Sequence, residues 1–218
     1  ATPIVQVVQW DESQMYLKQG EQITVDHLLA GLIVMSANDA AVTLAEKISG
    51  SIPQFVERMN KEAKALGMND TFFQNPAGIT MPEHYSSAAD LARLGSALVK
   101  DVPEYLNYSK QTSFSYNNHF HKATNILLKQ DPSVDGMKTG FTKAAGYNLA
   151  LTASRPTGLY NEPDRRLIVV VLGAKSGLKR AEVAHKLMNI AYTYTRNEVA
   201  IKDKQLIAEL PVIKSTLK

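Results

Sequence analysis

The chain has 218 residues, of which 44% are hydrophobic and 21% charged, a composition typical of a packed globular protein and not of a disordered chain. Its 24 basic and 21 acidic residues give a net charge of +3 and are dispersed along the sequence, which argues against nucleic acid as a partner. The absence of Cys excludes disulfides and thiolate metal sites, and the longest apolar stretches fall far short of the roughly 20 residues that cross a bilayer.

Four helices are predicted in the first half of the chain, because apolar residues recur there at helical spacing between recognisable start and stop signals. Ser51 and Ser87 begin two of them as the first residues of capping boxes, and Gly50 and Gly67 end two. The expected helices cover residues 25–34, 40–48, 52–66 and 88–102.

After residue 103 the pattern changes to one that is typical of strands. A surface hairpin is expected over 113–122, with its turn at Asn117 and Asn118. The third of the later strands is an unbroken apolar run, which suits a strand buried on both faces. The expected elements after the hairpin are strands over 134–141, 147–153 and 167–172, a helix over 178–194 that packs on their sheet, and a β-like stretch over 199–210.

Lys138, Thr139 and Gly140 stand together in the strand expected over 134–141. A cation and a hydroxyl can bind a carboxylate, and a residue without a side chain lets another backbone approach the strand closely. This combination suits recognition of a peptide C-terminus. An exposed Lys and Thr on an edge strand is the competing interpretation, and the tripeptide alone favours neither.

Ser36 and Asn38 form the pattern S-x-N at the joint between the first two expected helices. The pattern fixes only two positions, and helix capping explains it when it is considered alone. Its neighbourhood in the sequence gives it more weight.

Three segments in this order resemble the serine-type D-alanyl-D-alanine carboxypeptidases, which are the low-molecular-mass penicillin-binding proteins of peptidase family S11. They are GLIVMSANDAA at 31–41, YSSAAD at 85–90 and VDGMKTGFTKAAGY at 134–147. The resemblance implies an α+β fold of the β-lactamase/transpeptidase type, with an antiparallel sheet flanked by helices. It also implies that residues 1–196 are an N-terminally incomplete catalytic domain and that 197–218 begin a β-rich C-terminal domain.

The reaction that the resemblance implies is removal of the terminal D-Ala from peptidoglycan stem peptides through an acyl-enzyme, the route by which β-lactams become attached. Ser36 would relay a proton toward the leaving amine. Asn38 would hydrogen-bond the peptide group of the substrate and order the catalytic Lys of the nucleophile motif.

The second motif would bind the end of the substrate. Lys138 and Thr139 would hold the terminal carboxylate, and Gly140 would let the substrate lie against the strand. The backbone N–H of Phe141 would donate to the oxyanion. The resemblance implies no metal or organic cofactor, and the partners that it implies are a stem peptide ending in D-Ala-D-Ala and β-lactam antibiotics.

The nucleophile motif of the family, S-x-x-K, is not found before Ser36. A Ser and a Lys three residues apart share one face of a helix, so the amine can accept the hydroxyl proton. The spacing occurs at Ser176-x-x-Lys179 and Ser215-x-x-Lys218, where a helix cap and a solvated tail are the simpler interpretations. We therefore expect this chain to lack its attacking Ser and base Lys, to be inactive by itself, and to have an uncovered edge on its sheet.

Several alternatives remain open from the sequence. A DD-endopeptidase or a β-lactamase can be built on the same scaffold, and a non-catalytic module that binds peptidoglycan needs no nucleophile. His119 and His121 share one face of the hairpin but have no evident third metal ligand. His84 beside Glu83 lacks the spacing of a zinc hydrolase, and Asp90 is explained as part of a helix cap. The expected location is the periplasm or cell envelope, with any membrane contact through a C-terminal anchor that this chain does not contain.

Overall fold

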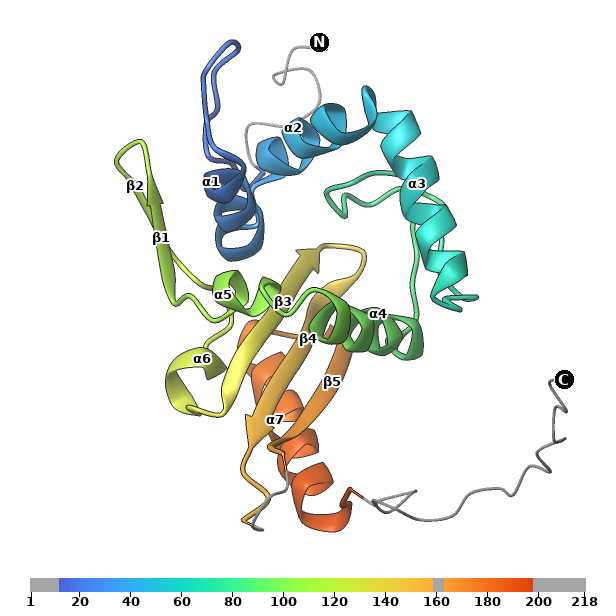
Figure 1. The fold of residues 1–218 in the computed structure, drawn as a ribbon, viewed down its shortest axis with the longest axis vertical. Coiled ribbons are helices and arrows are strands. Elements are labelled where there is room, and N and C mark those ends of the chain that lie inside the picture. Colours follow the sequence, from blue (N-terminus) through green and yellow to red (C-terminus); the bar gives the residue numbers. More distant parts are fainter. Residues whose placement is uncertain (1–11, 159–162, 198–218) are drawn as a thin grey trace, which may run out of the picture.

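The structure, a computed structural model, describes residues 12–158 and 163–197. These residues form a helical lobe and a sheet lobe, joined by shorter elements (Figure 1). The helical lobe contains α1 (Val25–Ala30), the π-helix η2 (Gly31–Met35), α2 (Asn38–Ser49) and α3 (Ile52–Ala65). The sheet lobe contains β3 (Val134–Thr142), β4 (Gly146–Arg155), β5 (Arg165–Ala174), α4 (Ala88–Asp101) and α7 (Gly177–Tyr194). The joining elements are α5 (Tyr105–Ser109), β1 (Ser113–Tyr116), β2 (His119–Lys122) and α6 (Leu127–Gln130).

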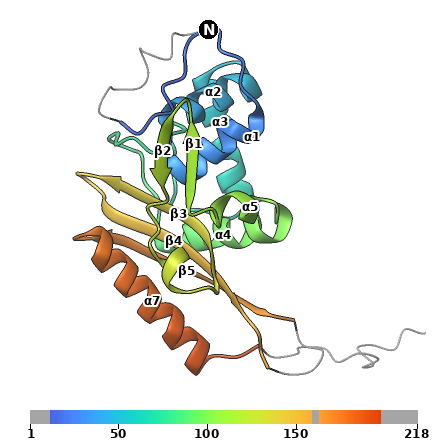
Figure 2. The same ribbon diagram turned by 90° about the vertical axis from the view of Figure 1, so that its left-hand side faces the viewer.

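The sheet is antiparallel in the order β3-β4-β5, with α7 packed on one face and α4 on the other (Figure 2). Alternate residues of β4, including Leu149 and Leu151, are buried in a core that Ala184 and Met188 of α7 complete. Alternation of this kind follows from the two-residue period of a strand. The α+β class with an antiparallel sheet flanked by helices is therefore confirmed.

The helical lobe has its own core, in which Met15 occupies the space beside Gly31. A Cβ at Gly31 would overlap the sulfur of Met15 and lie 2.9 Å from its Cγ. Met15 is fully buried and has little space into which to move. Gly31 is therefore required by packing and not by its backbone conformation.

Replacing Gly31 with Ala is expected to lower the free energy of unfolding by about 2 kcal/mol, because the added methyl group overpacks a filled core. Urea denaturation followed by circular dichroism measures the loss. Gly177→Ala is the matched control, since its Cβ would meet no atom closer than 3.8 Å. Equal stability of the two variants would contradict the packing role of Gly31.

Asp39 links the segment before α1 to α2. Its carboxylate is fully buried and accepts hydrogen bonds from three backbone N–H groups, at 3.0 Å each from Met15, Leu17 and Ala40. Hydrogen bonds to a charged acceptor are stronger than neutral ones. This carboxylate thereby fixes the segment that fills the space beside Gly31.

Most of the predicted elements are confirmed, with their ends shifted by a few residues. Ser51, Ser87 and Ser176 each cap a helix through the side-chain oxygen, and Asn117 and Asn118 have positive φ angles in the hairpin turn. The helices α5 and α6 have no counterpart in the prediction. The β-like stretch at 199–210 and the proposed start of a second domain lie outside the described residues, apart from residue 197.

Two of the predicted elements differ from the structure in more than their ends. The helix expected over 25–34 changes at Gly31 into a π-helix that continues to Met35. The strand β5 has α7 on one face and α4 on the other but is only partly buried, because Val171 is its one buried residue and Leu172 is 40% exposed. Within the described residues β5 pairs with β4 alone, so its outer edge is uncovered, as expected.

Candidate active site

Ser36 lies between η2 and α2 in a conformation that few residues other than Gly adopt. Its φ angle is 58°, in the left-handed region, and the N–H of Ala37 donates to the carbonyl of Gly31 at 3.1 Å. Single π-turns and left-handed non-Gly residues are both enriched at functional sites. Ser36 is the C-cap residue of η2, whereas the N-cap of α2 is Ala37 and Asn38 is already its first helical residue, so neither Ser36 nor Asn38 caps the start of α2 as predicted.

Lys138 of β3 meets Ser36 although the two are 102 residues apart in the sequence. Its Nζ donates hydrogen bonds to Ser36 Oγ and, at 2.7 Å, to the backbone carbonyl of Thr139. The contact joins the helical lobe to the sheet lobe. The S-x-N and K-T-G motifs, predicted separately, therefore form one site.

The environment of Lys138 favours the neutral amine more than water does. Burial and the nearby charge of Arg180 lower the pKa of Lys138 to about 8. An amine with a pKa near 8 can exchange a proton with a hydrogen-bonded hydroxyl more readily than an ordinary Lys can. Ser36 is the hydroxyl in that position.

Arg180 is a functional candidate that the sequence interpretation missed. It comes from α7, is almost fully buried, and donates to the carbonyls of Asn148 and Thr124 at 3.2 Å each. Its guanidinium also lies over the Tyr147 ring, 5.8 Å from the centroid. The sequence does contain a signal for it, because Arg180 falls on the face of α7 that carries the buried Ala184.

The other residues of the K-T-G segment differ in their surroundings. Thr139 is buried, and its hydroxyl shares a short hydrogen bond with the hydroxyl of Thr124. Gly140 is exposed, and a Cβ there would approach no atom closer than 4.0 Å. Phe141 is 55% exposed, and its ring centroid lies 4.3 Å from that of Tyr147. No strand of the described chain pairs with the outer edge of β3. The end of α5 and the segment before α6 donate to the first carbonyls of β3, and the edge at the K-T-G segment beyond them is open to a ligand.

Asn38 is close to the site in sequence but faces another partner. Its Nδ2 donates to Glu12 Oε2 at 2.8 Å. No hydrogen bond found between described residues joins its side chain to Ser36 or Lys138. The structure therefore does not bring Asn38 into the Ser36–Lys138 contact.

Asp90 does more than begin a helix. Ser87 caps α4, while the buried Asp90 carboxylate accepts from Asp70 N, Thr71 Oγ1 and Arg93, each at 2.8 Å. The interpretation of Asp90 as part of a cap alone was wrong. This carboxylate attaches the chain that follows α3 to the first turn of α4.

The remaining candidates have structural explanations. His119 packs its ring 4.8 Å from that of Tyr16, and His84 Nδ1 accepts from the backbone N–H of Gln74 at 3.0 Å, with its pKa lowered by burial. In the part of the chain that the structure covers, no three His, Asp or Glu side chains are grouped as metal ligands would be. Ser176 Oγ accepts from Lys179 N–H at 3.1 Å, which confirms a helix cap; Ser215 lies outside the described residues.

Solved structures share this arrangement of helices and sheet. Penicillin binding protein 5 from Haemophilus influenzae is similar with a TM-score of 0.78 and 39% identity, over 84% of this chain and 52% of that one. Penicillin-binding protein D2 from Listeria monocytogenes, solved in its ampicillin-bound form, gives a TM-score of 0.72 and 33% identity, over 85% and 74%. The fold is therefore that of the penicillin-binding proteins, with the transpeptidase-type architecture that the sequence predicted.

The sequence comparisons define the family within this class. The D-alanyl-D-alanine carboxypeptidase family, Peptidase_S11, matches residues 3–176. The D-alanyl-D-alanine carboxypeptidase DacC of Escherichia coli K12 is 40% identical over 191 residues, which are 87% of this chain and 46% of that protein. This chain belongs to the Peptidase_S11 family. It spans about half the length of the curated relatives that it matches.

Among the described helices, none has the length and apolar character needed to cross a membrane.

Proposed function

We propose that this chain supplies the substrate-binding part of a serine-type D-Ala-D-Ala carboxypeptidase, which removes the terminal D-Ala of peptidoglycan stem peptides through an acyl-enzyme. The observation that carries the proposal is the hydrogen bond from Lys138 Nζ to Ser36 Oγ, which joins the two motifs. Residues 1–196 form the catalytic domain and 197–218 begin a second domain. Since peptidoglycan lies outside the cytoplasmic membrane, we place the protein in the periplasm or cell envelope.

The substrate carboxylate binds where positive charge gathers beside the open edge of β3. Lys138 and the almost buried Arg180 supply the charge, and the Thr139 hydroxyl supplies a hydrogen bond. The peptide backbone lies along β3 as an added strand, and Gly140 leaves room for it. The same carboxylate pocket suits the carboxylate of a β-lactam.

Proton transfer passes through Ser36. Lys138, with its lowered pKa, gives a proton to Ser36 as the Ser36 hydroxyl protonates the leaving amine. The Phe141 N–H stabilises the oxyanion, and Asn38 binds the substrate peptide group after its amide leaves Glu12. Acyl transfer itself requires a nucleophile and base of the S-x-x-K type, which do not precede Ser36 in this sequence.

Binding of diacetyl-L-Lys-D-Ala-D-Ala to the 218-residue chain tests this assignment of the site for the substrate carboxylate. NMR chemical-shift titration measures the affinity. The free acid is expected to bind at least tenfold more tightly than the C-terminal amide of the same peptide, because the amide cannot pair with Lys138 and Arg180. Equal affinities would overturn the assignment.

Benzylpenicillin is expected to form no covalent adduct with this chain, because no Ser of the sequence combines the S-x-x-K spacing with a position before Ser36. Intact-mass spectrometry after incubation measures adduct formation, and a complete penicillin-binding protein treated in parallel is the positive control. A mass increase of one penicilloyl group mapped to any Ser of this chain would refute the prediction. If the protein were instead a non-catalytic peptidoglycan-binding module, this chain would also form no adduct. Turnover of a D-Ala-D-Ala peptide by the complete protein distinguishes the two hypotheses, because only a carboxypeptidase shows it.

A further inference from the structure

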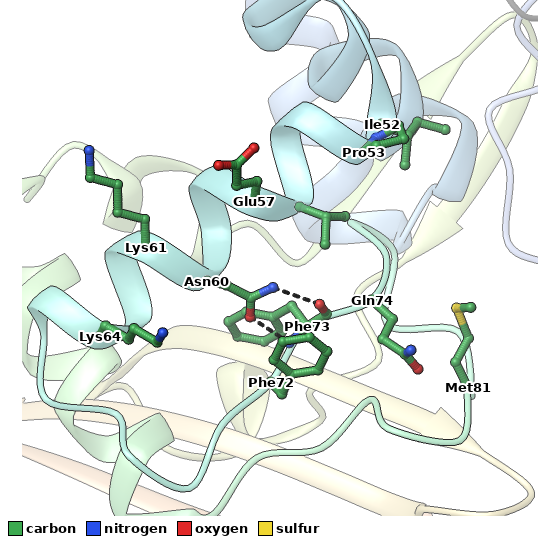
Figure 3. A pocket seen from close by; sticks show the side chains of 11 residues that line it. Ile52, Pro53, Glu57, Asn60, Lys61, Lys64, Phe72, Phe73, Gln74 and Met81 are labelled. Carbon is green, nitrogen blue, oxygen red and sulfur yellow. Dashed lines mark hydrogen bonds between the residues drawn. The ribbon is translucent and has the colours of Figure 1, made fainter.

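A groove of about 730 Å³ lies between α3 and the chain that follows it (Figure 3), and its lining includes neither Ser36 nor Lys138. We call it the α3 groove; its walls are the face of α3 from Ile52 to Lys64 and the segment 72–81. Its size is that of sites that hold small molecules or short chain segments. Nothing in the mechanism above uses it.

The floor of the groove is apolar and held open. Phe72 and Met81 are each 40% exposed, although both are large apolar side chains. Asn60 of α3 donates from Nδ2 to the carbonyl of Phe73 and accepts at Oδ1 from its N–H, both at 2.8 Å. These two bonds fix the spacing between helix and segment, so the groove does not depend on a ligand for its shape (Figure 3).

The rim on α3 carries two cations without acidic partners. Lys61 and Lys64 lie one turn apart, and both are exposed (Figure 3). The ion pairs between described residues include neither of them, and Glu57 is the single carboxylate of the lining. The groove therefore suits an anionic ligand that also has apolar surface.

A hydrogen bond connects the groove to the strand that binds the substrate. Thr80 Oγ1 donates to Thr142 Oγ1 at 2.9 Å, and Thr80 directly precedes Met81 at one end of the groove. Thr142 ends β3 four residues after Lys138, which is about 13 Å along a strand. A chain that runs along β3 from a carboxylate at Lys138 past Gly140 to Thr142 is therefore directed toward the Met81 end of the groove.

We propose that the α3 groove binds the part of the peptidoglycan polymer that lies upstream of the D-Ala-D-Ala end, meaning the carboxylate-bearing stem and the sugars attached to it. This inference rests on the proposed function. An extended pentapeptide spans roughly 17 Å, so its terminal sugars pass beyond Thr142 and reach the groove. The sugar faces and aliphatic groups pack on Phe72 and Met81, and carboxylates of the polymer pair with Lys61 and Lys64.

The test compares a short and a long ligand on the full 218-residue chain. The short ligand is diacetyl-L-Lys-D-Ala-D-Ala, and the long one is the disaccharide pentapeptide with the same D-Ala-D-Ala end. The long ligand is expected to bind about tenfold more tightly by NMR titration, because two linked contacts add. In the variant K61Q/K64Q this advantage is lost, while affinity for the short ligand stays the same.

The matched control is K47Q/K100Q, which removes the same charge from exposed positions outside the groove. The control is expected to keep the tenfold advantage, and circular dichroism shows that both variants fold. An equal affinity for short and long ligands, or equal behaviour of the two double variants, would overturn the proposal.

The disaccharide tetrapeptide, which lacks the terminal D-Ala, separates this inference from the proposed function. If the tetrapeptide binds in a way that depends on Lys61 and Lys64 while the short ligand does not bind, the role of Lys138 in carboxylate binding is wrong and the role of the α3 groove is supported. If the short ligand binds and the sugars do not increase the affinity, the proposal for the α3 groove is wrong while the proposed function is unaffected.

Discussion

Replacing Asp39 with Asn is expected to lower the free energy of unfolding by about 3 kcal/mol. The two side chains have nearly the same shape, so the change isolates hydrogen bonding. Asp39 accepts from Met15, Leu17 and Ala40 through both oxygens, and Asn would place an N–H₂ donor against at least one of those N–H donors. Since the site is fully buried, water cannot replace the lost acceptor.

Urea denaturation measures this loss, and Asp101→Asn, at the exposed end of α4, is the control. The control is expected to change stability by less than about 0.5 kcal/mol, as is usual for exposed sites. The Asp39 variant is also expected to lose protection of the Met15 and Leu17 amides in hydrogen exchange. An unchanged unfolding midpoint would show that the carboxylate does not hold this segment.

Replacing Lys138 with Ala is expected to weaken binding of diacetyl-L-Lys-D-Ala-D-Ala at least tenfold, because the carboxylate loses a charged partner beside β3. The unchanged chain is expected to lose affinity as the pH rises through about 8. Burial and the charge of Arg180 lower the pKa of Lys138 to about 8, so the ammonium is present below that pH and is lost above it.

The variant Lys138→Arg tests whether loss of the Lys138 charge causes the fall in affinity at high pH. Arg stays protonated throughout the range, so affinity is expected to vary little between pH 7 and pH 9.5. NMR titrations at several pH values give both profiles. A pH profile that is the same in the Arg variant and the unchanged chain would assign the titration to another group, and full affinity in the Ala variant would remove Lys138 from the binding site.

The regular elements were predictable because their signals are local. Three helices begin at a Ser whose side-chain oxygen accepts from the backbone N–H three residues later, namely Ser51, Ser87 and Ser176. A few neighbouring residues therefore determine where each of these helices begins. The π-helix was not predictable, since the apolar spacing that indicates a helix does not distinguish an α-helix from a short π-helix. The partial burial of β5 was not predictable, because an apolar run indicates hydrophobicity and does not say how completely the helices on the two faces cover the strand.

For the site, the sequence predicted the motifs but not the contacts between them. Ser36 and Lys138 were identified through resemblance, and their hydrogen bond depends on how the two lobes pack. Arg180 was missed because a single Arg in a helix is usually solvated. Its burial depends on contacts with β4 and with residue 124, which are distant in the sequence. Lys61 and Lys64 likewise look like ordinary surface residues until the segment 72–81 is placed beside them.

The central position of β4 has a consequence for how fast the two edges of β3 exchange their hydrogen-bond partners. β4 is bonded to a strand on each side, and Leu149 and Leu151 have almost no exposed surface, so their amides are expected to exchange with solvent only through global unfolding. The strand β3 shares one of those ladders, and from the K-T-G segment onward no described strand pairs with its other edge. One row of β3 amides is therefore kinetically locked to β4, while the opposite row can gain and lose a ligand on a much faster timescale without disturbing the fold.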